Sequence, residues 1–182
     1  MRFERYGEAV LPEIRGVLSQ VYAEIYAEQL DDPFFSVAGF ERRLAGQVSV
    51  GGWECVVAWD GEQVAGYAYG ATLPASTGWW RKTAPALSPE DAHETGSRTV
   101  AVFEVMVREG WRGTGLAERV HEELVTARPE ERATLLVEDT HPKVLALYES
   151  WGYRRIGNQR PFRDAPLYAV MVRDLARTDS PQ

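Results

Sequence analysis

An apolar run that passes into a glycine-rich turn constrains the fold of this chain more than any other feature. The run at 100–107 has the composition of a buried strand, and the turn at 112–117 follows it. Behind the turn, Leu116, Val120 and Leu124 recur at helical spacing. The segment therefore predicts a strand, a tight turn and a helix start. Glycines let the backbone approach a ligand, and free N–H groups at a helix N-terminus favour an anion.

Arg112 adds a fixed positive charge to this turn, and a pyrophosphate is the ligand that fits it. A P-loop is excluded, because Leu116 and Ala117 stand where Lys and Ser or Thr are needed. A dinucleotide fingerprint is excluded as well, because Glu118 occupies the third small-residue position. A tight strand-to-helix turn that binds nothing remains the alternative.

Val-Met-Val at 105–107 and Gly-Trp-Arg-Gly-Thr-Gly-Leu-Ala at 110–117 resemble the pyrophosphate loop of the GNAT superfamily of acyl-CoA-dependent N-acyltransferases. The family pattern is Q/R-x-x-G-x-G/A. Gly113 and Gly115 match it, with Gly110 departing at the first position, while Arg112-x-x-Gly115-x-Ala117 satisfies it in a second register. We prefer the first register, because Arg-Gly-x-Gly directly at the helix start is the commoner arrangement in that family.

A second motif lies at 141–153 and resembles the family's N-x-x-A-x-x-L-Y-x-x-x-G-F/Y. The positions that match are Leu147, Tyr148, Gly152 and Tyr153. His141 replaces the Asn that usually contacts the CoA arm, and Val144 replaces the Ala. The resemblance implies acetyl-CoA as co-substrate, and it implies a set of CoA-binding positions: Val105, Met106, Val107, Arg112, Gly113, Thr114, Gly115, Leu116, Ala117 and His141.

The resemblance also implies an α/β (α+β) fold, the GNAT fold, as a single domain over 1–182. Its sheet is mixed and mostly antiparallel, with about six or seven strands flanked by about four helices. The element order read from the chain, βααβββαβαββ, is that of this fold. Periodicity and turn residues predict helices at 8–30, 40–48, 116–128 and 141–151, strands at 54–59, 64–70, 100–107, 133–137, 154–157 and 167–172, a long loop at 73–98 and a frayed tail at 177–182.

Composition excludes several classes of function. The net charge of −7 argues against nucleic-acid binding and is compatible with a cationic acceptor. Cys55 is the only cysteine, and the three histidines are scattered without zinc spacing, so no metal is expected. No stretch approaches the roughly 18 apolar residues of a membrane span, and the N-terminus lacks a signal-peptide stretch. We therefore expect a cytoplasmic protein without membrane contact.

Acyl transfer from a thioester to an amine needs a neutral amine, a stabilised carbonyl oxygen and a proton for the departing thiolate. The resemblance implies that pantetheine enters a splay between the 100–107 and 133–137 strands. Backbone at 105–107 then pairs with its amides and supplies the oxyanion donor. Much of the rate would come from positioning.

Two side chains are candidates for proton transfer. Tyr148 stands where the family's thiolate-protonating tyrosine stands, although its spacing also suits a core tyrosine. Glu104 is the only charge within 100–107; burial would raise its pKa and its strength as a base, whereas a structural ion pair with an arginine is the alternative. Asp139 is a weaker candidate, and His93 and His141 are weaker still, with His141 expected to cap its helix.

Trp79 and Trp80, followed by Arg81, and the segment 160–166 lie in loops that would border the acceptor pocket on the GNAT plan. Exposed paired tryptophans indicate a binding face, a lid or a homodimer contact, and local packing of a long loop is the alternative. The main hypothesis is an acetyl-CoA-dependent N-acetyltransferase for a small-molecule or protein amine. A non-catalytic acyl-CoA-binding module and a protein-interaction domain using the Trp79-Trp80 loop are the competing hypotheses.

Overall fold

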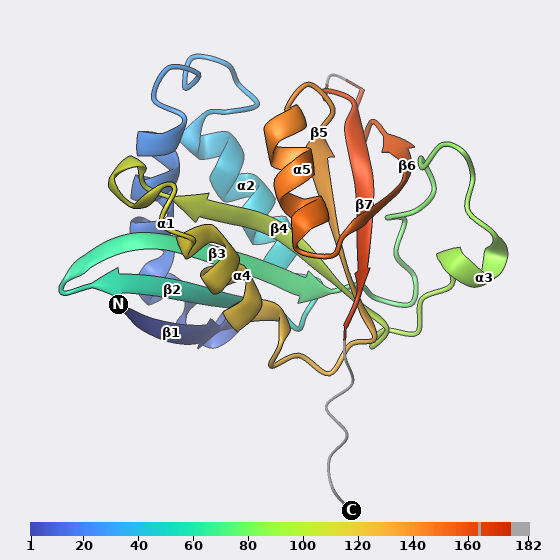
Figure 1. Cartoon of the computed structure of the whole chain (residues 1–182), viewed down its shortest axis with the longest axis horizontal. Coiled ribbons are helices and arrows are strands. Elements are labelled where there is room, and N and C mark those ends of the chain that lie inside the picture. Colours follow the sequence, from blue (N-terminus) through green and yellow to red (C-terminus); the bar gives the residue numbers. More distant parts are fainter. Residues whose placement is uncertain (164, 176–182) are drawn as a thin grey trace, which may run out of the picture. The chain divides into compact units, whose positions relative to one another are not determined.

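The computed structural model describes residues 1–163 and 165–175, and the predicted frayed tail at 177–182 lies outside them (Figure 1). Seven strands are found in the described residues: β1 (Arg2–Gly7), β2 (Glu54–Asp60), β3 (Gln63–Thr72), β4 (Thr99–Val107), β5 (Arg132–Glu138), β6 (Arg154–Gln159) and β7 (Tyr168–Asp174). The helices are α1 (Leu11–Ile25), α2 (Val37–Val48), α3 (Pro89–Ala92), α4 (Leu116–Val125) and α5 (Pro142–Ser150), with 3-10 turns at Glu8–Val10 and Glu109–Trp111.

The predicted element order is confirmed, with the four-residue helix α3 added inside the 73–98 loop. The strand order is β1-β2-β3-β4-β5-β7-β6. β4 pairs with β5 in parallel, whereas β1–β2, β2–β3, β5–β7 and β6–β7 pair antiparallel. The expected mixed, mostly antiparallel sheet and the α/β class are therefore confirmed.

Two helices are shorter than the sequence suggested. The helix predicted over 8–30 begins with a 3-10 turn, and α1 runs only over Leu11–Ile25. It is followed by i→i+3 turns, such as Gln29 N to Tyr26 O at 2.8 Å. The helix predicted to reach residue 128 ends at Val125, where the Thr126 hydroxyl donates to Glu122 O at 2.6 Å. Such local side-chain bonds compete with continued helix.

Contacts divide the chain into two compact units, each of which is described by itself. Unit 1 contains residues 1–71 and 102–127, and unit 2 contains the described residues of 72–101 and 128–182. The single domain over 1–182 stays a prediction. In the described part of the chain, each helix is too short or too polar to cross a membrane.

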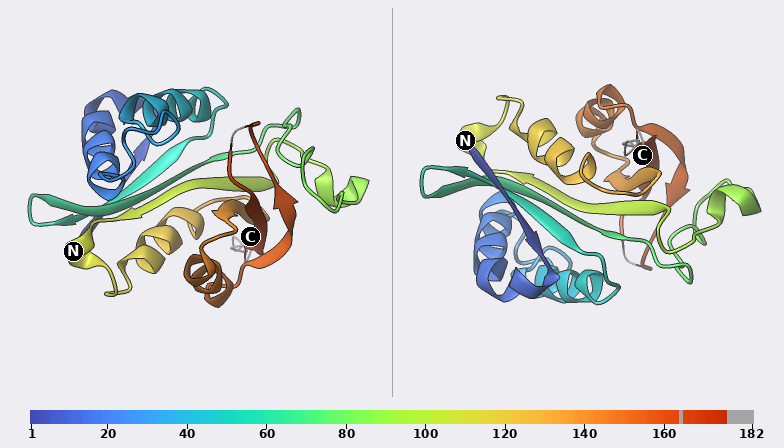
Figure 2. Two further views of the ribbon diagram at one scale, coloured as in Figure 1. Left: turned by 90° about the horizontal axis from the view of Figure 1, so that it is seen from above. Right: turned by 90° about the horizontal axis from the view of Figure 1, so that it is seen from below.

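In unit 1, α1 and α2 lie on one face of the strands, and α4 lies on the other (Figure 2). α1 buries Ile14, Leu18 and Val21, the spacing of one helical stripe, against a core that includes the buried rings of Tyr67 and Tyr69. β3 approaches β4 closely at Gly66, where an added Cβ would lie 2.4 Å from Met106 O. Only glycine allows this approach, which fixes the strand that carries residues 102–107.

Hydrogen bonds between parallel and antiparallel strands and two buried ion pairs stabilise unit 2. β5 pairs with the start of β4 through residues 132–134 and with β7 along its full length. Arg132 forms a salt bridge with Glu94 at 2.9 Å, and Arg128 forms one with Glu130 at 2.7 Å. Thr72 donates to Glu130 Oε1 at 2.7 Å, and Trp80 and Thr99 donate to Glu94 Oε1 at 3.0 Å and 2.7 Å. These contacts tie the loop after β3 to the segment around β5.

Candidate active site

The glycine loop, residues 112–117, connects the 3-10 turn after β4 to α4 in unit 1. Gly113 and Gly115 have φ angles of +74° and +80°, a conformation that side chains rarely adopt. A Cβ added at either position would meet no atom within 4 Å, so the glycines are required by backbone conformation and not by crowding. The first register of the family pattern places both residues at glycine positions, and the structure thereby favours that register.

The first turn of α4 presents backbone N–H groups without a side-chain cap. Its N-cap residue is Gly115, and the first intrahelical bond runs from Arg119 N to Gly115 O at 3.2 Å. The N–H groups at 116–118 therefore lack helical partners. Thr114 Oγ1 donates to Trp111 O at 2.7 Å, and Arg112 Nε donates to Val107 O at 3.2 Å. The loop can thus receive an anion through backbone donors and the positive end of the helix dipole.

Glu104 lies on β4 in unit 1 and keeps partial exposure. Burial raises the pKa of its carboxyl to about 7, and the Arg43 guanidinium counteracts this shift. The carboxylate in turn contributes to raising the pKa values of Tyr67 and Tyr69 on β3, although burial is the main cause there. A carboxyl that titrates near neutral pH matches the needs of a general base. The sequence-based expectation of a raised pKa thus agrees with the structure.

Arg43 and Tyr22 complete the polar surroundings of Glu104, and sequence reasoning missed both. Arg43 on α2 donates to Tyr22 Oη at 3.1 Å and to Phe34 O at 2.6 Å, and its guanidinium lies 4.8 Å from the Phe34 ring centroid. Tyr22 on α1 stacks on Phe40 at 4.3 Å. No local motif marks these residues, because only the packing of α1 and α2 on the sheet brings them near Glu104.

Residues 105–107 form the end of β4, as predicted. Val105 keeps partial exposure, whereas Met106 and Val107 are buried. Arg108 N, just beyond the strand, donates to Ala65 O at 2.9 Å, which anchors this end to β3. The predicted splay between the 100–107 and 133–137 strands involves residues of both units and stays a prediction.

In unit 2, Tyr148 lies on α5 and is half-buried. Its ring makes edge-to-face contacts with Trp151 at 4.9 Å and Tyr153 at 5.7 Å. His141 is exposed and stands at the N-cap position of α5, as expected, but its side chain forms no capping hydrogen bond. Its carbonyl accepts from Val144 N at 3.0 Å instead, as Pro142 sets the first turn.

The contacts of the remaining candidate residues argue against the roles expected for them. Asp139 forms a salt bridge with Arg155 at 2.7 Å, so its carboxylate already has a partner. The expectation of an exposed tryptophan pair is wrong for Trp80, which is 6% exposed and donates through Nε1 to Glu94 at 3.0 Å. Packing of the 73–98 loop accounts for this residue. Among the described residues, no group of three or more His, Cys, Asp or Glu side chains is placed to hold a metal ion.

Solved structures with the same fold cover almost the whole chain. A GNAT-family protein from Desulfovibrio desulfuricans is 16% identical with a TM-score of 0.66, covering 96% of this chain and 99% of its own. Ribosomal-protein-alanine N-acetyltransferase from Brucella melitensis is 19% identical with a TM-score of 0.58, covering 96% and 100%. The protein yncA from Salmonella typhimurium, solved with its cofactor acetyl-CoA, is 17% identical with a TM-score of 0.56, covering 100% and 98%. At these identities the likeness shows the fold alone.

A search of curated proteins found no match. The family model described as acetyltransferase (GNAT) family matches residues 18–153. This range includes the strand with Glu104, the glycine loop and the motif around Tyr148. The chain therefore belongs to the acetyltransferase (GNAT) family.

Proposed function

We propose that this protein transfers an acetyl group from acetyl-CoA to a primary amine of a small molecule or a protein, by direct attack in a ternary complex. The observation that carries the proposal is the glycine loop, whose two left-handed glycines open onto free space before an uncapped helix start. The solved structure of yncA with acetyl-CoA, a protein of the same fold, supports the choice of co-substrate.

The residues of the glycine loop fit a pyrophosphate. The backbone N–H groups at 116–118 and the guanidinium of Arg112 supply donors and positive charge, and no side chain fills the space beside Gly113 or Gly115. Backbone at 105–107 and the side chain of His141 are the further proposed contacts of the CoA arm. When bound, the thioester supplies the activated acetyl group.

Glu104 is the proposed base for the acceptor. The acceptor nitrogen must lose a proton before or during its attack on the thioester carbonyl, because a protonated amine has no free electron pair. Glu104, with a pKa of about 7, can take that proton at and above neutral pH. The new C–N bond replaces the C–S bond, and Tyr148 is the proposed donor of a proton to the departing thiolate. A net charge of −7 supports a cationic acceptor.

The non-catalytic acyl-CoA-binding module remains the second candidate, because Gly110 and His141 depart from the family patterns. The interaction domain has lost its main support, since Trp80 is buried. A cytoplasmic location and a homodimer stay predictions.

Calorimetric titration of acetyl-CoA into wild type and Gly113→Glu tests the binding site. We expect the variant to bind at least about tenfold more weakly, because its carboxylate stands where the pyrophosphate would lie. Gly61→Glu is the matched control: Gly61 has a φ of +60° and open space around it in the β2–β3 turn, so it suffers equal strain and gains equal charge. Equal affinity of wild type and Gly113→Glu would contradict the assignment.

Thiol release from acetyl-CoA with a panel of amines separates the enzyme from the binding module. We expect amine-dependent release at rates well above the amine-free background. Tight acetyl-CoA binding without release for any primary amine, peptide N-terminus or lysine side chain in the panel would favour the binding module.

A further inference from the structure

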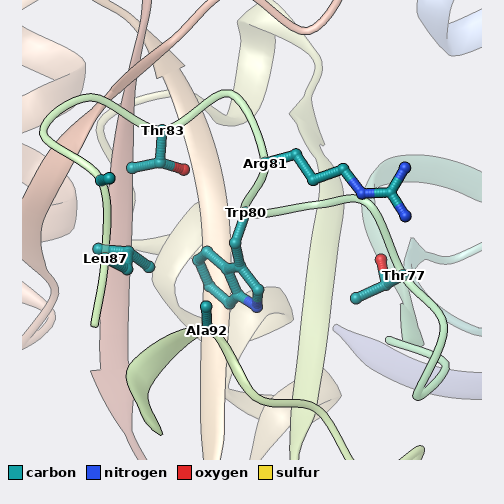
Figure 3. Close-up of a pocket in the computed structure, with 7 residues that line it drawn as sticks. Thr77, Trp80, Arg81, Thr83, Leu87 and Ala92 are labelled. Atoms are coloured by element: carbon teal, nitrogen blue, oxygen red, sulfur yellow. The ribbon is translucent and has the colours of Figure 1, made fainter. Parts of the chain in front are cut away.

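The pocket in the 73–98 loop of unit 2 does not gather polar groups around one ligand (Figure 3). Its volume is about 270 Å³, but Trp80 in its lining is only 6% exposed and Thr83 Oγ1 is buried. Figure 3 shows Thr83 on one side of the Trp80 indole and Arg81 on the other. Groups of opposite charge lie together instead in unit 1, around Glu104.

Arg43 and Glu104 carry opposite charges but do not bond to each other. Burial raises the pKa of the Glu104 carboxyl and the charge of Arg43 lowers it, so the two groups lie within electrostatic reach. Within the described residues, neither a salt bridge nor a hydrogen bond joins them, and the Glu104 carboxylate has no other side-chain partner. Both side chains are partly exposed. A ligand with two opposite charges could therefore satisfy both.

The packing of α2 on the strands places Arg43 over this part of β4. Arg43 and Gln47 are one turn apart on α2 and so lie on the same face of the helix. Gln47 Oε1 accepts from Tyr69 Oη at 3.1 Å, and the Tyr69 ring lies 6.3 Å from that of Phe103, the neighbour of Glu104 on β4. The face of α2 that carries Arg43 is thereby fixed against the strand that carries Glu104.

The guanidinium of Arg43 is held in place and still has N–H groups to donate. It donates to Phe34 O at 2.6 Å and to Tyr22 Oη at 3.1 Å, and it lies 4.8 Å from the Phe34 ring centroid. These bonds leave other N–H groups of the guanidinium available. No carboxylate pairs with it in the described part of the chain, and the nearby Asp32 accepts from Phe34 N at 2.8 Å. A fixed, partly exposed guanidinium of this kind suits a carboxylate.

We propose that the acceptor is an amine that also carries a carboxylate, an amino acid being the simplest example. Arg43 binds the carboxylate, and Glu104 takes the proton of the amino group. The nitrogen forms its bond to the acetyl carbon as the C–S bond breaks, which gives an N-acetyl amino acid and the thiol of CoA. The inference rests on the proposed acetyl transfer, because it names the acceptor of that reaction.

The rings beside Arg43 favour an apolar side chain on this acceptor. Tyr26, Phe34 and Phe35 are all partly exposed. Tyr26 stacks on Phe35 at 5.3 Å, and Phe34 meets Phe35 edge to face at 5.1 Å. Because aromatic rings bury apolar groups well, an aliphatic amino acid is the first probe to use.

The test compares three acceptors with the same side chain: leucine, leucinamide, in which a neutral amide replaces the carboxylate, and 3-methylbutylamine, which lacks it. Thiol release at saturating acetyl-CoA gives kcat and KM for each. We expect kcat/KM for leucine to exceed that for leucinamide by about tenfold or more, mainly through KM. The comparison is a strict one, because the carboxylate raises the pKa of the leucine amino group and keeps more of it protonated.

Arg43→Gln should remove most of the preference for leucine over leucinamide, whereas Arg43→Lys, which keeps the charge, should retain part of it. Arg42→Gln, which removes the exposed neighbouring arginine of α2, is the matched control and should keep the full preference. A purely structural role of Arg43 would lower the rates with all three acceptors alike. Circular dichroism checks that each variant folds.

Ligand-observed NMR with CoA-loaded protein measures acceptor binding without turnover, which separates this inference from the acetyl transfer. Binding of leucine that prefers it to leucinamide and depends on Arg43, without thiol release, would support the acceptor class and contradict the transfer. Equal kcat/KM for the three acceptors, or a preference that survives in Arg43→Gln, overturns the acceptor class and leaves the transfer standing. Leucine that neither binds at tens of millimolar nor reacts overturns it as well.

Discussion

Two glutamates in the two units have opposite surroundings. Glu94 in unit 2 is 4% exposed, and its Oε1 accepts from Arg132 at 2.9 Å, Trp80 at 3.0 Å and Thr99 at 2.7 Å. Glu104 in unit 1 is partly exposed. The positive charge of Arg43 attracts its carboxylate, but no direct salt bridge to Glu104 is found within the described residues. Glu104 lies in an apolar run of the chain and Glu94 in a polar one, yet it is Glu94 that is more deeply buried and surrounded by donors.

The difference shows how surroundings assign a carboxylate to structure or to chemistry. Donors that point at a carboxylate fix its position, as Arg132, Trp80 and Thr99 do at Oε1 of Glu94. Burial with few donors disfavours the charge, which is why the pKa of Glu104 rises to about 7. A group of the second kind can exchange a proton with a substrate near neutral pH. The following predictions test whether this division holds.

The largest effect is expected from Glu104→Gln. This change keeps the shape of the side chain but removes the proton acceptor, so kcat/KM should fall by about 100-fold or more. In wild type, activity should rise with pH through the pKa near 7, because the base must be ionised, and the variant should lose this acidic limb. Initial rates of thiol release across pH 5–9 provide the measurement.

Glu62→Gln in the exposed β2–β3 turn is the control for that experiment and should behave as wild type. Near-normal activity of Glu104→Gln with an unmoved pH profile would return Glu104 to a structural role and leave water or Asp139 as the acceptor of the proton.

Glu94→Ala should lower the free energy of unfolding by about 3 kcal/mol or more, because it leaves the buried Arg132 guanidinium without its anion. Glu90→Ala, at an exposed position in α3, should change it by less than about 0.5 kcal/mol. Urea denaturation of both variants gives the comparison. If the two variants were equally stable, the network around Glu94 would not hold the 73–98 loop.

Tyr148→Phe asks whether unit 2 also contributes to the chemistry. Loss of the proposed proton donor should slow thiol release by roughly tenfold or more while acetyl-CoA affinity stays within a few-fold, because the hydroxyl acts mainly in the transition state. Initial rates of thiol release and calorimetric titration of acetyl-CoA, both on the same preparation, separate the effect on rate from the effect on affinity. An unchanged kcat with a lowered stability would identify Tyr148 as a core residue packed against Trp151 and Tyr153.

The smallest effect is expected from Arg43→Gln, as a shift of the acidic limb of the pH–activity profile with 3-methylbutylamine as acceptor. The guanidinium lowers the pKa of Glu104, so its removal should move the limb to higher pH by less than about one unit. Arg42→Gln, the exposed neighbour on the same helix, is the matched control and should leave the limb in place. A limb that moves to lower pH would show that Arg43 does not act on Glu104 by its charge.

Local sequence signals were sufficient for most of the fold. The strands predicted at 54–59 and 64–70 are found as the β2–β3 hairpin, and the tight turn predicted at the glycine loop precedes α4, where the structure adds the left-handed conformation of Gly113 and Gly115. Helix ends were less well predicted, since α1 and α4 both stop earlier than their apolar periodicity suggested. Ends depend on single hydrogen bonds, such as the one from the Thr126 hydroxyl, that periodicity does not contain.

The sequence by itself determined the strand–turn–helix of the glycine loop, the order of the elements and the presence of a lone charge on β4, because these depend on residues close together in the chain. Only the tertiary structure decided what surrounds each charge. It brought Arg43 and Tyr22 to the side of Glu104 and buried Trp80 against Glu94 and Arg132. Burial and pairing between distant residues set pKa and rigidity, and they are properties of packing that no local pattern encodes.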